Sequence, residues 1–297
     1  MRRVLLVSNP ASRRGGVLHA RAVAALRNAG AACDAVLTEA PGHGGGIAAE
    51  LASQYDAVFA LGGDGTVMEI MGALVGSDVP LGVLPGGTGN LIARSLGVPL
   101  GVTAAVRALL RGSTTRMDLG RVHGGPRFAV SAGCGTDAET VARTPAALKQ
   151  LLGMWAYTLA ATRAVLRARL FDVRLEVDGR VIERQASVVM IVNQPTVLNG
   201  MFSFGPGISN SDGMLDLCVH TPRGTGEAAH IMWRLSRRDY RETPSMLFAR
   251  GQRFKVETSP AEPAQADGEL LGSGTLTVDV EPLAALFLTP AKEGTRT

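Results

Sequence analysis

Aromatic residues, cysteines and long apolar runs are all scarce in this chain of 297 residues, and each scarcity excludes something. Aromatics make up 4% of the residues against 46% for hydrophobic residues as a whole, so the core must be mainly aliphatic. The three cysteines show no CxxC or Cys/His spacing, which excludes a cysteine metal site and indicates a reduced, cytoplasmic protein. The apolar segment 151–162 is shorter than the ~20 residues that cross a bilayer, and MRRVLLVSNP does not form a signal peptide.

Several catalytic signatures are also absent. The chain has no GxxxxGK[ST] loop, no GxGxxG of the dinucleotide kind, no HExxH and no GxSxG elbow, which argues against P-loop enzymes, zinc proteases and the usual hydrolases. The formal net charge is +4 and the pI is about 9.3, which is too mild to indicate a nucleic-acid partner. Such a charge suits anionic partners such as phosphates or a membrane surface.

Residues 1–118 alternate the patterns of strands and helices. Strands are expected at 4–7, 33–38, 56–61 and 80–85, and helices at 17–30, 44–53 and 66–74. The strand candidates are short, nearly continuous apolar runs, as in strands covered on both faces. The order predicts an α/β domain with a parallel, doubly wound sheet.

The pattern changes near residue 116, and residues 119–282 form the second expected domain. Alternating residues in 171–193 flank the turn residues Asp178 and Gly179, which predicts a hairpin. Further strands are expected at 214–220, 253–259 and 275–280, and one long helix at 145–168. This part is therefore mainly antiparallel β. The last apolar run, 283–288, could pair with either domain.

Two glycine loops share one design. LGGDGT and LPGGTGN each follow an apolar strand with two glycines, a polar residue, a third glycine and a helix pattern. Loops at the carboxyl ends of parallel strands line the ligand crevice, and their amides can point at an anion. Asp64 would repel phosphates unless a cation, most simply Mg²⁺, lies between them. The alternative is that Asp64 is a turn residue or a helix cap.

Five segments in order resemble the motifs of the diacylglycerol kinase catalytic family, which includes sphingosine and ceramide kinases. They are GGDGTVMEI, LPGGTGNLIARSLGVP, GCGTDAE, NSDGMLDL and ADGEL. The resemblance runs from Asn9 to about residue 288. The family usually carries Asn where this chain has Met68.

The resemblance implies an α/β nucleotide domain, a C-terminal β-sandwich-like domain, and an active site in the cleft. It implies transfer of the γ-phosphate of ATP to a lipid hydroxyl with Mg²⁺, the acceptor being diacylglycerol-like, and a chain end (283–297) that returns to the first domain. It assigns the nucleotide to Asn9, Thr38, Gly62, Gly63, Asp64, Gly65, Thr66, Glu69, Gly86, Gly87, Thr88 and Asn90.

The same resemblance implies that Asp64 is a catalytic residue. It also places Asp267 and Glu269 in the DGE element, which carries the general base of the family. If that turn stays nearly extended, residues two apart face the same side, and both carboxylates serve the site. The alternative is an Asp-Gly hairpin with two solvated acids. The resemblance also implies a structural metal site at Asp212, completed by carbonyls near Ser209 and Met214.

The segment 223–253 mixes seven arginines with Met232, Trp233 and Leu235, which suits an anionic membrane interface. A solvated face with a buried Trp is the alternative. We therefore expect a cytoplasmic lipid kinase that visits the inner membrane face, with no nucleic-acid partner and with a homodimer left open. The rivals are an NAD kinase-like enzyme, since that family also uses GGDGT, and a nucleotide- or lipid-binding regulator that has lost catalysis.

Overall fold

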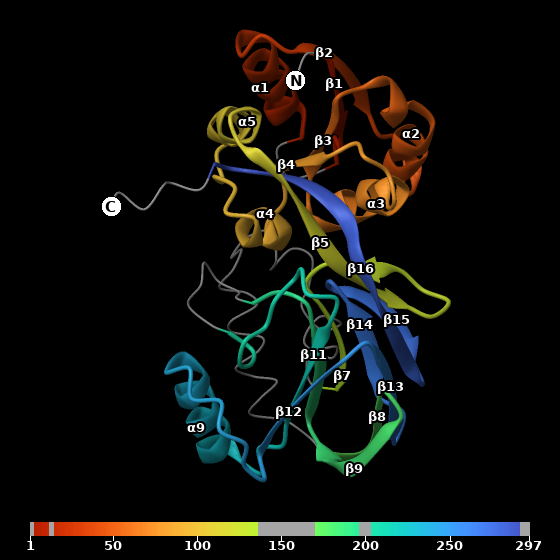
Figure 1. Cartoon of the computed structure of the whole chain (residues 1–297), viewed down its shortest axis with the longest axis vertical. Helices are drawn as coiled ribbons and strands as arrows, with labels where there is room; N and C mark the ends of the chain where they lie inside the picture. Colours follow the sequence, from red (N-terminus) through yellow and green to blue (C-terminus); the bar gives the residue numbers. More distant parts are fainter. Residues whose placement is uncertain (1–2, 12–14, 136–169, 196–202, 292–297) are drawn as a thin grey trace. The chain divides into compact units, whose positions relative to one another are not determined.

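A computed structural model describes residues 3–11, 15–135, 170–195 and 203–291 of the chain (Figure 1). The chain divides into two compact units, one formed by Met1–Met117 with Ala284–Thr297 and the other by Asp118–Leu283. The helix expected at 145–168 lies outside the described residues. No helix among the described residues is long and apolar enough to cross a membrane.

The first unit is built on parallel strands in the order β2-β1-β3-β4. The end of β16 joins them and pairs in parallel with β4 at Phe287 and Leu81. All six residues of β3 are buried, as expected for a strand covered on both faces. The strands are β1 (Arg3–Ser8), β2 (Ala32–Leu37), β3 (Ala57–Gly62), β4 (Leu81–Pro85) and β16 (Leu276–Thr289).

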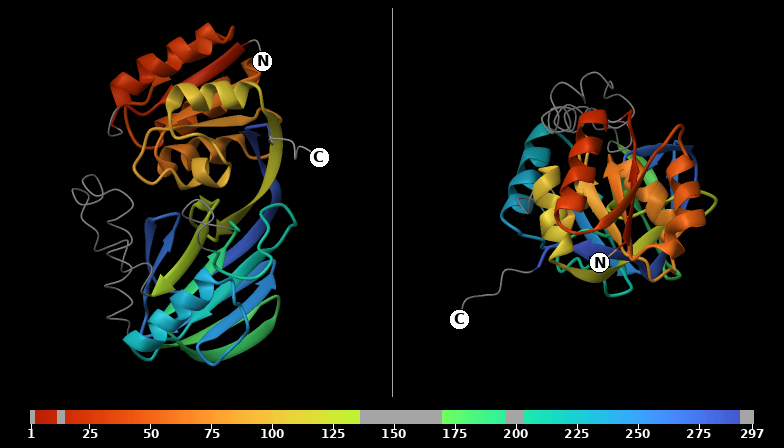
Figure 2. Two further views of the ribbon diagram at one scale, coloured as in Figure 1. Left: turned by 90° about the vertical axis from the view of Figure 1, so that its left-hand side faces the viewer. Right: turned by 90° about the horizontal axis from the view of Figure 1, so that it is seen from above.

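Helices cover both faces of this sheet (Figure 2). Helices α1 (Gly15–Asn28) and α5 (Val102–Leu110) pack together on one face, and α2 (His43–Leu51) and α3 (Asp64–Leu74) on the other. A short helix α4 (Leu91–Ser95) follows β4, and a 3₁₀ turn η1 (Ala52–Gln54) follows α2. The predicted doubly wound parallel sheet is confirmed.

The second unit contains a six-stranded sheet in which every pairing is antiparallel, in the order β12-β11-β10-β7-β14-β15. Its strands are β7 (Ser131–Gly135), β10 (Val188–Val192), β11 (Leu215–His220), β12 (Met246–Gly251), β14 (Pro263–Ala266) and β15 (Glu269–Ser273). A second layer follows the order β16-β13-β8-β9, with β5 and β6 beside it. Its further strands are β5 (Ser113–Val122), β6 (Arg127–Phe128), β8 (Phe171–Val177), β9 (Arg180–Ala186) and β13 (Arg253–Ser259).

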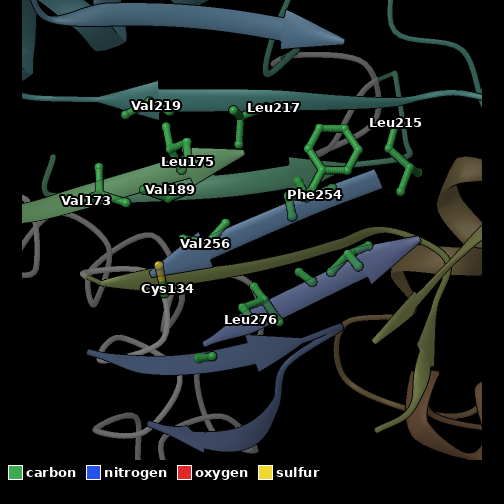
Figure 3. Close-up of a cluster of buried hydrophobic side chains, with 14 of the residues drawn as sticks. Cys134, Val173, Leu175, Val189, Leu215, Leu217, Val219, Phe254, Val256 and Leu276 are labelled. Atoms are coloured by element: carbon green, nitrogen blue, oxygen red, sulfur yellow. The ribbon is translucent and has the colours of Figure 1, made fainter. Parts of the chain in front are cut away.

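The core of the second unit lies between these two layers (Figure 3). Strand β8 buries every second residue, as a strand does when one face meets a core. Leu175 on β8 and Val256 on β13 share one cluster with Val189 on β10 and Leu217 on β11. The β-sandwich that the family resemblance implied is therefore present.

Three details differ from the sequence-based expectation or complete it. The returning strand after Asp178 and Gly179 is two strands, β9 and β10, which belong to different sheets. The runs 275–280 and 283–288 form one strand, β16. Its first part pairs with β13, while the last run pairs with β4 at Phe287 and so belongs to the first unit, as the family resemblance implied. A helix, α9 (Thr225–Ser236), lies within the basic segment, where no helix was expected.

Candidate active site

The two glycine loops of the first unit lie backbone against backbone. Strands β3 and β4 are parallel neighbours, with Gly62 opposite Pro85. The Gly86 N–H donates to the Gly62 carbonyl oxygen at 2.9 Å. A Cβ added to Gly87 would come within 2.6 Å of the Gly63 Cα, so no side chain fits between the loops. Gly62 and Gly86 are buried and Gly63 and Gly87 are half-buried, and backbone without side chains is of the kind that binds phosphate.

Asp64 links the two loops. It is the first residue of α3, and its Oδ1 accepts the Ile92 N–H at the start of α4 at 3.0 Å. Its Oδ2 lies beside Gly89, where an added Cβ would come within 3.1 Å. Burial raises the pKa of the Asp64 carboxyl, and backbone N–H groups, that of Ile92 foremost, oppose this effect. Asp64 is thus a cap for α4, as the alternative interpretation held, and it also places a carboxylate oxygen at the second glycine loop.

Asn9 and Thr66 hold the opening loop against α3. The Asn9 Nδ2 donates to the Thr66 Oγ1 at 3.1 Å, and the Asn9 N–H donates to the Leu61 carbonyl oxygen. Gly65 is exposed in the first turn of α3, where helix N–H groups lack acceptors within the helix. The structure therefore brings these predicted nucleotide residues together at the end of β3.

Thr38 and Glu69 lie beside the start of α2. Thr38 is buried, and its γ-methyl would be 3.5 Å from a Cβ on Gly44. The Glu69 Oε1 accepts the Gly45 N–H at 3.0 Å. Glu69 therefore caps α2, much as Asp64 caps α4, so one helix supplies both acids.

Asn90 shapes the second glycine loop. Its Oδ1 accepts the Gly87 N–H and its Nδ2 donates to the Gly87 carbonyl oxygen, each at 2.9 Å. Its φ of 49° is left-handed, which Asn tolerates better than most residues. Thr88 is half-buried in the same loop, and its hydroxyl makes no hydrogen bond with the described residues. Thr88 rather than Asn90 is thus the side chain here with a donor to offer.

In the second unit, the DGE element is a tight hairpin between β14 and β15. Asp267 and Gly268 have φ of 46° and 87°, and Ala266 pairs with Glu269 across them. Two residues with positive φ form the turn that suits a two-residue hairpin. The expectation of a nearly extended turn, with both carboxylates on one side, is therefore wrong.

The Asp267 carboxylate is held by backbone. Its Oδ2 accepts the Ala129 N–H at 2.7 Å, and its Oδ1 accepts the N–H groups of Val130 and Ser131, both at 2.9 Å. The Glu269 side chain at the start of β15 is exposed. The two acids differ, since the first fixes the hairpin to the 129–131 segment and the second is accessible.

The Asp212 turn contains an arginine where the resemblance implies a metal ion. The Arg250 guanidinium contacts the Asp212 Oδ2 at 2.7 Å and the Asp216 Oδ1 at 3.3 Å, and also donates to the Gly207 carbonyl oxygen at 3.2 Å. The Met214 N–H donates to the Asp212 Oδ1. The described residues contain no cluster of three or more His, Cys, Asp or Glu side chains that could hold a metal. These contacts do not fit a cation site, because Arg250 already supplies the positive charge.

Ser209, the other residue named for that site, accepts the Ser211 N–H through its hydroxyl. Asp118, which the sequence did not single out, is the residue that holds the Asp212 turn through hydrogen bonds. It is fully buried, and its carboxylate accepts the N–H groups of Gly213 and Leu283, each at 2.7 Å. A single acid inside the run of β5 was the available signal, because a buried carboxylate has to be paired.

Comparison with known proteins agrees with this arrangement. The chain matches the diacylglycerol kinase catalytic domain over residues 3–122 and the YegS C-terminal NAD kinase beta sandwich-like domain over residues 129–289. An uncharacterized protein of Synechocystis is 31% identical over 79% of this chain, which spans only 55% of that relative. A diacylglycerol kinase of Bacillus subtilis is 29% identical over 74% of this chain and 73% of its own length.

A solved structure of a diacylglycerol kinase from Bacillus anthracis has the same fold, with a TM-score of 0.78 at 24% identity over 97% of this chain and 96% of that chain. An α/β unit with paired glycine loops and a β-sandwich unit together define a class of kinase-like proteins. The chain belongs to the diacylglycerol kinase catalytic-domain family, with the C-terminal domain of the YegS type.

Proposed function

We propose that the protein is an ATP-dependent kinase that phosphorylates a lipid hydroxyl, with a diacylglycerol-like acceptor. The observation that carries the proposal is the pair of touching glycine loops bridged by the Asp64 carboxylate. Family membership supports it, as do relatives from Bacillus subtilis and Staphylococcus aureus that are named diacylglycerol kinases.

In this proposal the ATP phosphates bind to the amides of the glycine loops and of the first turn of α3. Thr88 adds a hydroxyl donor, while Asn90 keeps the loop in shape. A bound Mg²⁺ would neutralise phosphate charge and so allow Asp64 to lie near the anion. The rise in the pKa of Asp64 on burial fits this role, because a neighbouring cation favours its ionised form.

Glu269 is the proposed general base, and Asp267 is the residue that positions it. The lipid oxygen forms a bond to the γ-phosphorus while the bond from that phosphorus to the β-bridging oxygen breaks, releasing ADP. The hydroxyl proton passes to the Glu269 carboxylate. In a loose transition state that proton moves late, so the group that accepts it need not be a strong base.

The test is phosphate transfer from labelled ATP to a panel of acceptors: diacylglycerol, monoacylglycerol, phosphatidylglycerol, sphingosine, ceramide and NAD. We expect label in a glycerolipid. NAD belongs in the panel because NAD kinases also use GGDGT and because the C-terminal domain is of the NAD kinase beta sandwich-like type. Label in NAD alone would overturn the lipid assignment. ATP binding without any transfer would instead identify a regulator that has lost catalysis.

A further inference from the structure

The inner face of helix α9 (Thr225–Ser236) packs against other residues of the second unit. Ile231 and Leu235 pack with Met246 at the start of β12, and Ala228 is also buried. The buried Arg234 guanidinium contacts the Asp239 carboxylate and donates to the Arg241 carbonyl oxygen, which fixes the chain after the helix. The helix is therefore firmly attached, and its outer face is a stable surface.

That outer face carries large apolar side chains among cations. Trp233 is 55% exposed and Met232 is 45% exposed. The His230 ring stacks on the indole of Trp233 with centroids 5.8 Å apart, and the Arg237 guanidinium lies 5.7 Å from the indole centroid. His230, Trp233 and Arg237 are three and four residues apart, so they share one face of the helix.

The carboxylates of this region are held by partners of their own. Glu227 accepts from the Ser245 hydroxyl and the Arg223 N–H, and these bonds hold its pKa below the usual range. Contacts with Arg241 first, and then Arg234, lower the pKa of Asp239. Arg237 and Arg238 are both exposed and form no salt bridge with the described residues. The two acids of α9 and of the turn after it are therefore paired, which leaves the cations and apolar side chains of the outward surface unopposed by Glu227 and Asp239.

We propose that the outer face of α9, with Arg237 and Arg238 at its end, docks on an anionic lipid membrane. Charge complementarity selects this occupant, since the surface offers unpaired guanidinium groups to lipid phosphates. An exposed indole beside cations is the arrangement that suits the headgroup boundary, where the ring enters the interface and the charges stay with the headgroups. The surface would act whichever lipid hydroxyl the kinase phosphorylates.

Within the basic segment 223–253, the structure limits the arginines that can contact lipid to those on and after the outer face of α9. Arg234 is buried in its contact with Asp239, and Arg250 binds Asp212 and Asp216, so neither is available to lipid. Five arginines face three acids between residues 223 and 242, which leaves this region with a net positive charge.

The test uses the full chain and vesicles that contain no diacylglycerol, so that binding is measured apart from catalysis. Sedimentation compares phosphatidylcholine alone with phosphatidylcholine mixed with phosphatidylglycerol. One variant combines Arg237→Gln with Arg238→Gln, and another combines Met232→Ser with Trp233→Ser. The matched control, Arg180→Gln with Val181→Ser, removes an exposed cation and an exposed apolar residue from the β8–β9 hairpin, where Val181 is 47% exposed.

We expect wild type and the control to bind anionic vesicles and to release as salt rises from about 0.1 M to about 1 M. The double arginine variant should bind ~30-fold more weakly, because each basic residue at such a surface contributes roughly a fivefold factor. Brominated lipid should quench wild-type fluorescence more than that of Trp233→Phe. The proposal would be overturned if all variants bound equally, or if wild type bound neutral vesicles as well as anionic ones. It would also be overturned if the protein formed a dimer without lipid and Trp233→Ser dissociated that dimer.

Discussion

Two aspartates beside glycines, Asp64 in the first unit and Asp267 in the second, look alike in the sequence but are held differently. Asp64 accepts the Ile92 N–H and is buried enough for its carboxyl pKa to rise. Asp267 accepts three backbone N–H groups from residues 129–131. What the donors connect decides the role: those of Asp267 fix a turn to residues 129–131, while those of Asp64 lie mainly at the start of α4 and leave its carboxylate beside the glycine loops.

Other acids extend this comparison. Glu69 caps α2, and the buried Asp118 fixes both Gly213 and Leu283. Hydrogen bonds from N–H groups to a charged acceptor are worth about 1.5–3 kcal/mol each, so such carboxylates hold loops effectively. An acid in a glycine-rich turn is therefore a structural anchor unless an oxygen remains for a ligand.

The largest expected effect is on Asp64. Asp64→Asn keeps an acceptor for the Ile92 N–H but removes the charge, so the fold should survive while phosphate transfer falls by on the order of 10³ or more. Single-turnover transfer and melting should be measured together. The matched control is Asp56→Asn, which likewise neutralises an acid that accepts a backbone N–H in the first unit, but at the start of β3 rather than at the glycine loops. Near-normal transfer in Asp64→Asn would reduce Asp64 to a cap and remove the distinction from Asp267.

Glu269 should be the second most sensitive position. Glu269→Gln removes the proposed base from an exposed side chain, so transfer should fall by about 10²–10⁴ with the melting temperature and ATP affinity unchanged. Calorimetry with ATP and single-turnover transfer on one preparation test this. A wild-type rate would place the base elsewhere.

Asp267 should respond in the opposite manner, with stability lost before chemistry. Asp267→Asn suits the left-handed backbone but can satisfy the three N–H donors only in part, which costs about 1.5–3 kcal/mol. For a unit of this size the melting temperature should drop by roughly 5–10 °C. Transfer measured well below the melting temperature should fall less than in Glu269→Gln. Loss of transfer without loss of stability would contradict the anchoring role.

The sequence predicted the parallel sheet, the paired glycine loops and most strands, because their patterns are local. Apolar runs specify buried strands, and glycines after them specify close backbone approach. It did not predict that Asp64 reaches Ile92 or that Arg250 reaches Asp212, since these contacts join residues 28 and 38 apart. Ser187 divides β9 from β10, and no residue-level pattern marks the change of sheet there. Helix α9 was not predicted because its buried face combines Ala228, Ile231 and Leu235 with the charged Arg234, which interrupts the 3.6-residue apolar period.

Asp216 differs from the acids that accept backbone N–H groups, because it should make the free energy of unfolding depend on pH. Burial raises the pKa of Asp216 to about 6, against an ordinary value of 3.8, with the Arg250 contact opposing it. The unfolded chain therefore loses this proton first, and the stability that Asp216 contributes at about pH 4 is lost as the pH rises through about 6.

Burial lowers the pKa of His220 to about 4, so its contribution changes the other way over the same range. The useful quantity is thus the difference between Asp216→Asn and wild type, in which all shared groups cancel. Relative to wild type, the variant should become more stable by about 2 kcal/mol between pH 4 and pH 6.5. The unfolding free energies of both proteins should be measured with urea across that range. A constant difference between them would contradict the raised pKa of Asp216.

The smallest expected effect tests the Asp212 turn, where a side-chain cation takes the place that a metal would have. The Arg250 side chain is 40% exposed, so water screens its pairs, and Arg250→Ala should cost only about 1 kcal/mol.

Removing the guanidinium leaves Asp212, Asp216 and the Gly207 carbonyl oxygen, which are oxygen ligands of the kind that Mg²⁺ and Ca²⁺ prefer. Without nucleotide, wild-type melting should therefore be indifferent to Ca²⁺, whereas Arg250→Ala should be stabilised by it. Arg250→Ala combined with Asp212→Asn is the control, because it should lose that response. A wild-type protein stabilised by Ca²⁺ and an unresponsive variant would show that the turn binds an ion with Arg250 in place.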